Sequence, residues 1–177
     1  MKKTITRMLL IIVIILTGMH LNAQKLSKTF SFGIGIEGGF VSGDFKDVYG
    51  GNAGITLRGS YHAGPGFVTL TSGAIAFLPK SFKGENLKAG VLIPVRAGYK
   101  YIFQQRFFAM GEIGYGSFKS FYKDENDDLQ SETSSGFLFS PSAGVQFGTT
   151  EIGIRYESVS LSGATLSSIG ARIGFNF

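Results

Sequence analysis

The chain has 177 residues, of which 17 are basic and 12 acidic, and it contains 26 glycines but no cysteine. The lack of cysteine excludes a disulfide framework and thiol chemistry. Three basic residues and no acidic ones precede Gln24, so the remainder has a formal charge of only +2. The basic character therefore gives little support to a nucleic-acid-binding protein.

The N-terminal segment has the layout of a secretory signal peptide. Three basic residues precede the unbroken apolar run Met8–Leu16, and the small residue Ala23 follows. A charged start, a short apolar middle and a small residue at the cut define such a signal. The run is shorter than the roughly 20 residues that a membrane-spanning helix needs. We predict a cleaved signal at 1–23 and one domain at 24–177. Leu21 is bulkier than the residue usual three positions before a cleavage site, so the exact cleavage position is left open.

The rest of the chain alternates apolar and polar residues with a period of two, which is typical of β-strands. Strands of about ten such residues, separated by turns, are typical of transmembrane barrels. The glycines are spread through these strands, as suits a narrow, curved barrel. Eight strands are predicted, at Phe30–Val41, Asn52–His62, Phe67–Leu78, Leu87–Phe103, Phe107–Phe118, Gly136–Phe147, Glu151–Val159 and Ser167–Phe177.

Two of these strands carry a local irregularity in their sequence. Pro94 cannot donate a ladder hydrogen bond, so we expect the sheet to be disturbed beside it. In the third strand, Thr71 suggests a polar inward face, yet the apolar Phe77 has the same parity. A bulge near Ser72–Gly73 would switch the register between them.

The last strand has the most regular alternation, and the sequence finishes on an aromatic residue. Chain ends are usually frayed and polar, whereas a strand that closes a barrel in a bilayer has reason to finish in this way. Its apolar face consists of Ile169, Ala171, Ile173, Phe175 and Phe177.

Alternation by itself does not say which face is inside, because a soluble barrel buries its apolar face and a membrane barrel exposes it to lipid. The apolar faces here carry no charge, and aromatic residues gather at strand ends, as in membrane girdles. Short and long connections also alternate, as they do between the two sides of an outer membrane. The short ones are 63–66, 104–106 and 148–150, and the long ones are 42–51, 79–86, 119–135 and 158–166.

The predicted leader, the alternating strands and the closing segment Arg172–Phe177 together resemble the small outer-membrane β-barrel proteins of the OmpA/OmpX type. The resemblance covers the chain from about Phe30 to Phe177 and implies an all-β fold, an eight-stranded antiparallel up-and-down barrel without a periplasmic domain. It also implies that the terminal strand serves as the signal read by the outer-membrane assembly machinery. The residues that would carry this signal are Ile173, Phe175 and Phe177.

Charged residues on the inward parity are the candidate site. An eight-stranded barrel is just wide enough for side chains to fill it, and charges there must pair or be hydrated. If the turn at 104–106 is centred on Gln105, Glu112 lies opposite Gly98 and diagonal to Arg96 and Lys100, which predicts a salt bridge to at least one of them. The predicted lumen network is Glu37, Arg58, Arg96, Lys100, Glu112, Arg155, Glu157 and Arg172.

Signals for other chemistry are weak. His62 is the only histidine after the leader, and it lies beside a short turn, so a base and nucleophile pair is not expected. Asp124, Asn126 and Asp128 match the first positions of a calcium loop, but Leu129 and Ser135 replace its glycine and glutamate. We therefore expect no enzyme, no cofactor and no metal site, and we expect an acidic, solvated loop instead.

Taken together, these features predict a monomeric barrel in the outer membrane of a Gram-negative-type bacterium, with a lumen plugged by charged side chains. Its partners would be membrane lipid, the assembly machinery and an extracellular partner bound through the loops. The alternatives are a narrow porin-like channel for small anionic solutes, because five inward basic residues face three acidic ones, a lipid-modifying barrel enzyme, and a soluble lipocalin-like barrel.

Overall fold

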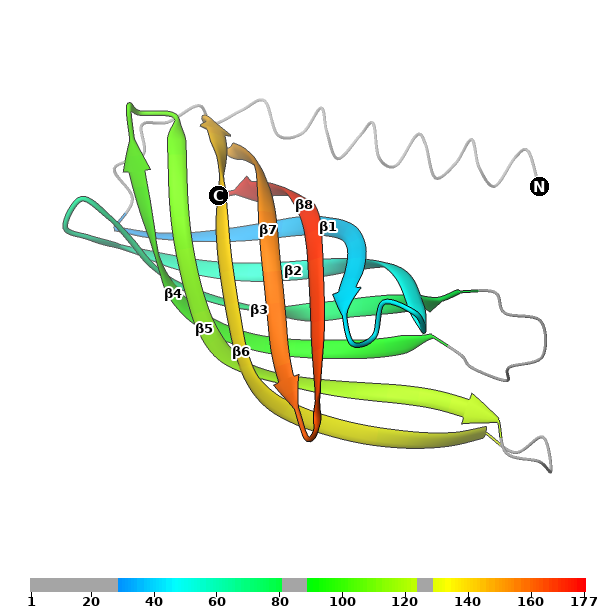
Figure 1. Ribbon diagram of the computed structural model, residues 1–177. Helices are drawn as coiled ribbons and strands as arrows, with labels where there is room; N and C mark the ends of the chain where they lie inside the picture. Colours follow the sequence, from blue (N-terminus) through cyan, green and yellow to red (C-terminus); the bar gives the residue numbers. More distant parts are fainter. Residues whose placement is uncertain (1–28, 81–88, 124–128) are drawn as a thin grey trace, which may run out of the picture.

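A computed structural model describes residues 29–80, 89–123 and 129–177, and these form a closed antiparallel barrel in which each strand pairs with the next (Figure 1). Antiparallel pairing of β8 with β1 closes the barrel. The predicted all-β, eight-stranded barrel is thus confirmed. The predicted signal at 1–23 lies outside the described residues. The strands are β1 (Phe30–Gly43), β2 (Tyr49–Ala63), β3 (Gly66–Pro79), β4 (Gly90–Phe103), β5 (Phe107–Lys123), β6 (Leu129–Phe147), β7 (Thr150–Leu161) and β8 (Ala164–Asn176).

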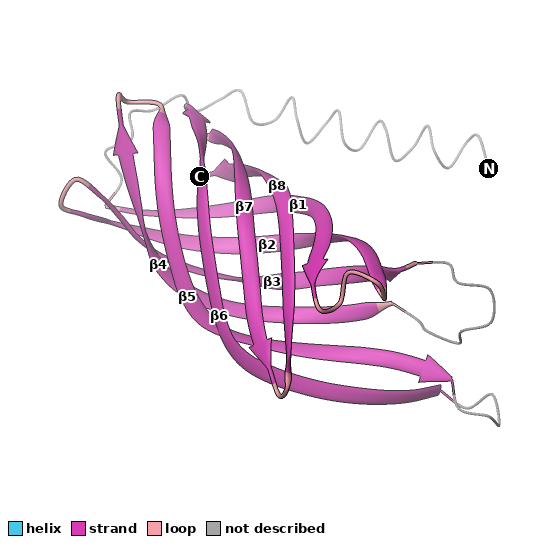
Figure 2. Ribbon diagram, viewed as in Figure 1, coloured by secondary structure: helices cyan, strands magenta, loops and turns pink. Residues whose placement is uncertain are grey.

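The described segments consist of strands and the turns between them (Figure 2). Within those segments we find no helix with the length and apolar character needed to cross a membrane.

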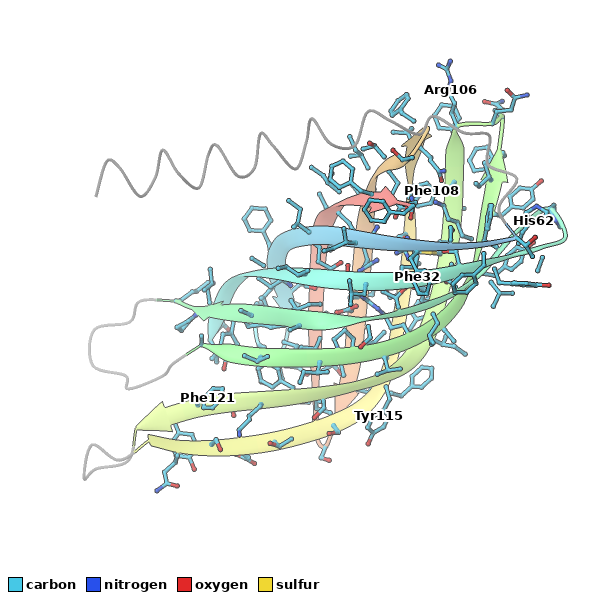
Figure 3. The ribbon with its side chains drawn as sticks, turned by 180° about the vertical axis from the view of Figure 1, so that it is seen from behind. Phe32, His62, Arg106, Phe108, Tyr115 and Phe121 are labelled. Atoms are coloured by element: carbon cyan, nitrogen blue, oxygen red, sulfur yellow. The ribbon has the colours of Figure 1, made fainter. Side chains whose placement is uncertain are left out.

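The two faces of the barrel wall have opposite chemistry. Large apolar side chains cover the outside, where Phe40 is 78% exposed, Ile154 69% and Phe32 63%. Tyr115 likewise points away from the barrel (Figure 3). Charged residues such as Arg96 lie inside, fully buried. This arrangement is the reverse of a soluble barrel, which buries its apolar face, so the lipocalin-like alternative is wrong.

The short β2–β3, β4–β5 and β6–β7 connections lie at one end of the barrel, which we call the short-turn end (Figure 1). At the opposite end, the β5–β6 hairpin extends beyond its neighbours, because β6 pairs with β5 from Leu129 but with β7 only from Phe137. We call this the hairpin end. The segment predicted as a long loop at 119–135 is therefore mostly paired strand.

A second predicted long loop, at 158–166, is also wrong. β7 and β8 remain paired as far as Leu161 and Ala164, which leaves a two-residue turn. Gly163 in this turn has a φ of +87°, a conformation that glycine adopts readily. The sequence Ser158–Leu166 contains enough serine and threonine to look like a loop, although its residues still alternate across the sheet.

The bulge predicted near Ser72–Gly73 is absent. Pairing of β2 with β3 continues unbroken through these residues, and the shift in this ladder lies instead between Tyr49 and Gly51. Thr71 and Phe77 both face the lumen, and both are buried. No register switch is needed, because the lumen itself changes from polar to apolar along its length.

Pro94 interrupts the sheet on one side only. The β3–β4 ladder has no pairs between the Ser72–Val95 pair and the Ile75–Leu92 pair. The register is the same on both sides of this gap. The proline ring provides no N–H for the missing bond. The predicted irregularity is thus present, without a shift in strand alignment.

An apolar cluster fills the lumen at the hairpin end. Aromatic rings pack edge to face within it, with the Phe77 and Phe118 centroids 5.6 Å apart. The β1–β2 connection adds the partly buried Phe45 and Val48 to the cluster. This part of the interior was not predicted, because leucines on the inward parity were hidden among serines and glycines. Its buried members are Tyr49, Ile75, Phe77, Leu92, Phe118, Leu138, Val159, Leu161 and Leu166.

Candidate functional site, a buried charge network

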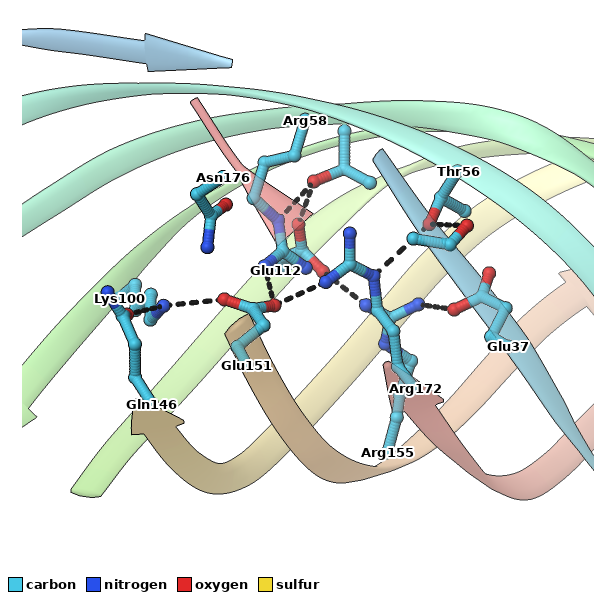
Figure 4. Close-up of polar contacts among 12 residues, drawn as sticks. Glu37, Thr56, Arg58, Lys100, Glu112, Gln146, Glu151, Arg155, Arg172 and Asn176 are labelled. Atoms are coloured by element: carbon cyan, nitrogen blue, oxygen red, sulfur yellow. Dashed lines mark hydrogen bonds and ion pairs between the residues drawn. The ribbon is translucent and has the colours of Figure 1, made fainter. Parts of the chain in front are cut away.

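Nine charged side chains lie in the lumen between the apolar cluster and the short-turn end. Figure 4 shows part of this network, around Glu151 and Arg172. The nine include all eight residues that the strand parity placed there. The ninth, Glu151, is the second residue of β7 and was not predicted. It has the same parity as Arg155 and Glu157, so extending the two-residue period by one step would have found it.

Glu151 is the centre of an inner cluster close to the short-turn end. Its Oε1 accepts a hydrogen bond from Arg58 Nη1 at 2.5 Å and another from Arg172 Nη1. Its Oε2 accepts from Lys100 Nζ at 2.6 Å. Lys100 also donates to Gln146 Oε1 at 2.7 Å. One buried carboxylate thus neutralises part of the charge of three cations.

The remaining charges form an outer cluster nearer to the middle of the barrel. Arg96 is paired with Glu157 and lies 3.6 Å from Glu37 Oε1, measured from its Nη2. Arg155 is paired with Glu37, and its Nη2 lies 3.6 Å from Glu112 Oε2. Two cations here face three carboxylates, so this cluster has an excess of negative charge.

The structure contains one of the two ion pairs predicted for Glu112. Glu112 lies opposite Gly98 in the β4–β5 ladder, as the turn centred on Gln105 required. Its Oε2 is 4.0 Å from Arg96 Nε, which forms one of the two ion pairs considered. Lys100 turns instead to the inner cluster and pairs with Glu151.

Thr71 connects the two clusters through a single hydroxyl. Arg58 Nε donates to Thr71 Oγ1 at 3.1 Å, and Thr71 Oγ1 donates to Glu112 Oε1 at 2.6 Å. A hydroxyl can donate once while it accepts, so it suits a bridge between a guanidinium and a carboxylate. The network is therefore continuous from Glu151 to the middle of the lumen.

The charges of the network do not balance. The inner cluster has Arg58, Lys100 and Arg172 against Glu151, and the outer cluster has two arginines against three glutamates. Five basic groups face four acidic ones, not the three that the sequence suggested. Buried N–H groups without an acceptor among the described residues, including Arg58 Nη2 and Arg172 Nη2, accompany this excess.

Two small cavities border these side chains. Among the described residues, one cavity of about 20 Å³ lies beside Glu37, Arg155 and Glu157, and another of about 10 Å³ lies beside Arg58 and Arg172. A single water needs about 10–15 Å³ of such volume. The charged half of the lumen thus has room for isolated small species.

His62 lies at the short-turn end, exposed, with its ring edge against Phe67 at a centroid distance of 5.2 Å (Figure 3). In the described part of the chain, no three His, Cys, Asp or Glu side chains gather in a group that could hold a metal ion. The calcium-loop residues Asp124, Asn126 and Asp128 lie outside the described residues.

The residues predicted to form the assembly signal lie on the outside of the barrel seam. Ile173 and Phe177 are exposed, and Phe175 is half-buried. The Phe177 N–H donates to the Phe32 carbonyl at 2.6 Å, which extends the β8–β1 closure beyond the last β8 residue.

The chain is similar to several solved structures. No protein-family model matches the chain, and no curated protein matches it. Among solved structures, it is similar to Ail, the attachment invasion locus protein of Yersinia pestis, with 16% identity, a TM-score of 0.64, and coverage of 84% of this chain and 97% of Ail.

Two further structures have the same architecture. The N-terminal β-barrel domain of Pseudomonas aeruginosa OprF matches with 13% identity and a TM-score of 0.61, over 83% of this chain and 97% of that domain. Neisserial surface protein A matches with 11% identity and a TM-score of 0.58, over 85% and 98%. With these neighbours and its closed eight-stranded sheet, the chain has the fold of the small outer-membrane β-barrel proteins.

Proposed function

We propose that the protein is a monomeric outer-membrane barrel without catalytic activity, in which a filled lumen supports a structural or surface-contact role. The observation that carries this proposal is that two kinds of side chain, ion-paired and apolar, occupy the two halves of the interior. Ion-paired side chains occupy the short-turn half, and the apolar cluster occupies the hairpin half.

The outside of the barrel supports residence in a lipid bilayer. Exposed apolar side chains occur on every strand, and the charged residues of the strand centres are turned inward. Lipid solvates such a surface, while barrel closure satisfies the backbone hydrogen bonds that would otherwise be exposed to hydrocarbon. Export through the predicted leader and assembly through Ile173, Phe175 and Phe177 complete this proposal.

The apolar cluster argues for a lumen that does not conduct ions. Phe77, Leu92 and Leu138 are 0–1% exposed and leave no polar group to solvate a passing ion. An ion without such solvation meets a large desolvation cost, which is how hydrophobic constrictions close channels. The charge network adds a second block, because its cations are already paired with carboxylates.

Single-channel recording in a planar bilayer tests this proposal. We expect silence from the refolded protein and from Glu112→Ala, since the apolar cluster remains intact in both, while a general porin in the same bilayer conducts. Discrete anion-selective steps that change in Glu112→Ala would contradict the proposal and favour the narrow channel. The network has one more basic group than acidic groups, and this excess would favour anions if the lumen conducted.

A lipid-modifying enzyme receives no support from the position of His62. Its ring packs on Phe67 at the short-turn end, and it accepts or donates no side-chain hydrogen bond with another described residue.

The β5–β6 hairpin is the element that we propose for surface contacts. It reaches beyond the β4–β5 ladder, which begins at Val91 of β4, and beyond the β6–β7 ladder, which begins at Phe137 of β6. A structure of Ail contains the heparin analogue sucrose octasulfate. In this chain residues 119–135 have two basic and five acidic residues, so a positively charged partner fits the hairpin better than a sulfated one.

A further inference from the structure

The inner cluster has too little negative charge for its cations. Arg58, Lys100 and Arg172 converge on Glu151, and both carboxylate oxygens of Glu151 are already engaged by them. Arg58 Nη2 and Arg172 Nη2 remain buried without an acceptor among the described residues. Leaving a buried charged donor unsatisfied costs several kcal/mol in the free energy of folding, so an additional acceptor would be strongly favoured here.

A small cavity lies beside these two arginines. Its volume is about 10 Å³, and Arg58, Ser142, Arg155 and Arg172 border it together with Glu151. Arg155 brings a further nitrogen without a partner, Nε, while its Nη2 is ion-paired with Glu112 at 3.6 Å. The Ser142 hydroxyl is buried without a partner in the described part of the chain. Three guanidinium groups and a hydroxyl can donate hydrogen bonds from the wall. The one carboxylate in the wall, Glu151, already accepts from Arg58, Lys100 and Arg172, so the cavity has an excess of donors that suits an anion.

Apolar side chains also line the cavity. Phe108 and Met110 are among them, and they are only 3% and 4% exposed. They lower the local dielectric constant and strengthen the attraction between a bound anion and the guanidinium groups. The volume suits a single-atom species and is too small for a phosphate or a carboxylic acid with its substituents.

We propose that this cavity is a binding site for one halide ion, with chloride as the natural ligand. The bound ion accepts hydrogen bonds from Arg58, Arg155 and Arg172, with Ser142 opposite Arg155 in the β6–β7 ladder as a neutral donor. One negative charge brings the five basic and four acidic groups of the lumen to neutrality. The site stabilises the barrel and requires no conduction, so it does not depend on the proposed closed lumen.

The first experiment locates the ion. The refolded full barrel is crystallised with bromide as the only halide, and anomalous differences are measured at the bromine edge. We expect one peak among Arg58, Ser142, Arg155 and Arg172. Bromide density restricted to the protein surface, or a water molecule in the cavity, would overturn the proposal.

The second experiment measures stability in solution with two variants of Ser142. The urea midpoint of the refolded barrel is followed as chloride replaces gluconate at constant ionic strength, since gluconate is too large for the cavity. We expect a saturable rise for the wild type, because a ligand that binds only the folded state stabilises it. Ser142→Asp supplies its own anionic group, so its midpoint should be high and independent of chloride.

Ser142→Asn is the matched control for the aspartate. It fills nearly the same space without a charge, so it should lose the chloride response and have a lower midpoint than Ser142→Asp. Equal midpoints for the two variants, or a wild-type midpoint that does not respond to chloride, would contradict the proposed site. The crystallographic measurement uses the wild type and remains decisive if either variant fails to fold.

Discussion

Individual carboxylates in the lumen differ in how much charge they balance. Glu151 accepts hydrogen bonds from three cations, whereas Glu157 is paired with Arg96. Removing one member of a buried ion pair leaves its partner uncompensated, which costs more than the pair contributes. Glu151 is thus the residue at which a single change should affect the network most.

Glu151→Gln tests this expectation with almost no change in volume. We expect the free energy of unfolding of the refolded barrel to fall by about 3–5 kcal/mol, the usual cost of breaking a buried pair, as measured by urea titration. Glu132→Gln, on the exposed part of β6, is the control and should change stability by less than about 0.5 kcal/mol. Similar results for the two variants would show that the inner cluster is hydrated in solution.

At the scale of elements, close contact between strands limits which residues the inner wall tolerates. A Cβ built on Gly114 of β5 would overlap the carbonyl oxygen of Val95 and lie 2.8 Å from the Arg96 Cα. A Cβ on Gly111 of the same strand would meet no atom within 4 Å. Gly114 is thus required by the approach of β4, and Gly111 is not.

These two glycines provide a matched pair of alanine substitutions in one strand. Gly114→Ala should destabilise the barrel by about 1–3 kcal/mol, the usual cost of overpacking, because backbone atoms must move. Gly111→Ala should be neutral or stabilising by up to about 1 kcal/mol, since it restricts the unfolded chain. Urea midpoints with unchanged slopes would measure both effects, and equal losses would argue against the described β4–β5 contact.

At the scale of the whole molecule, the proposed function requires the two ends of the barrel to lie on opposite sides of a membrane. The native chain has no cysteine, so a single introduced thiol reports its own position. Ser131 on the β5–β6 hairpin and Gln105 in the β4–β5 turn are both exposed. They therefore mark the hairpin end and the short-turn end.

We expect Ser131→Cys to react with a membrane-impermeant maleimide on intact cells. Gln105→Cys should react only after the outer membrane is permeabilised, because short turns face the periplasm in barrels of this fold. Labelling is measured as a mass shift of the purified protein, with the cysteine-free wild type as the blank. The reverse pattern would invert the proposed orientation, and labelling of both sites on intact cells would contradict residence in the outer membrane.

Much of the candidate site followed from the sequence. Alternation along β4, β5 and β7 placed Arg96, Glu112 and Arg155 inside, and the turn at Gln105 set Glu112 opposite Gly98. These results depend on the period of a strand and on the residue count across one hairpin, which are local properties. Glu151 has the same parity and was missed only because it lies next to a turn.

The sequence by itself determined the closed barrel, its apolar outside and the charged residues of its lumen, because a two-residue period sorts side chains between two faces wherever the strand lies. Only the tertiary structure decided which charges pair across the lumen, such as Arg58 with Glu151, 93 positions apart. It also decided that leucine and phenylalanine side chains from β3 to β8 meet in one cluster. Both depend on the alignment of all eight strands around the closed barrel, and no segment of the chain carries that alignment alone.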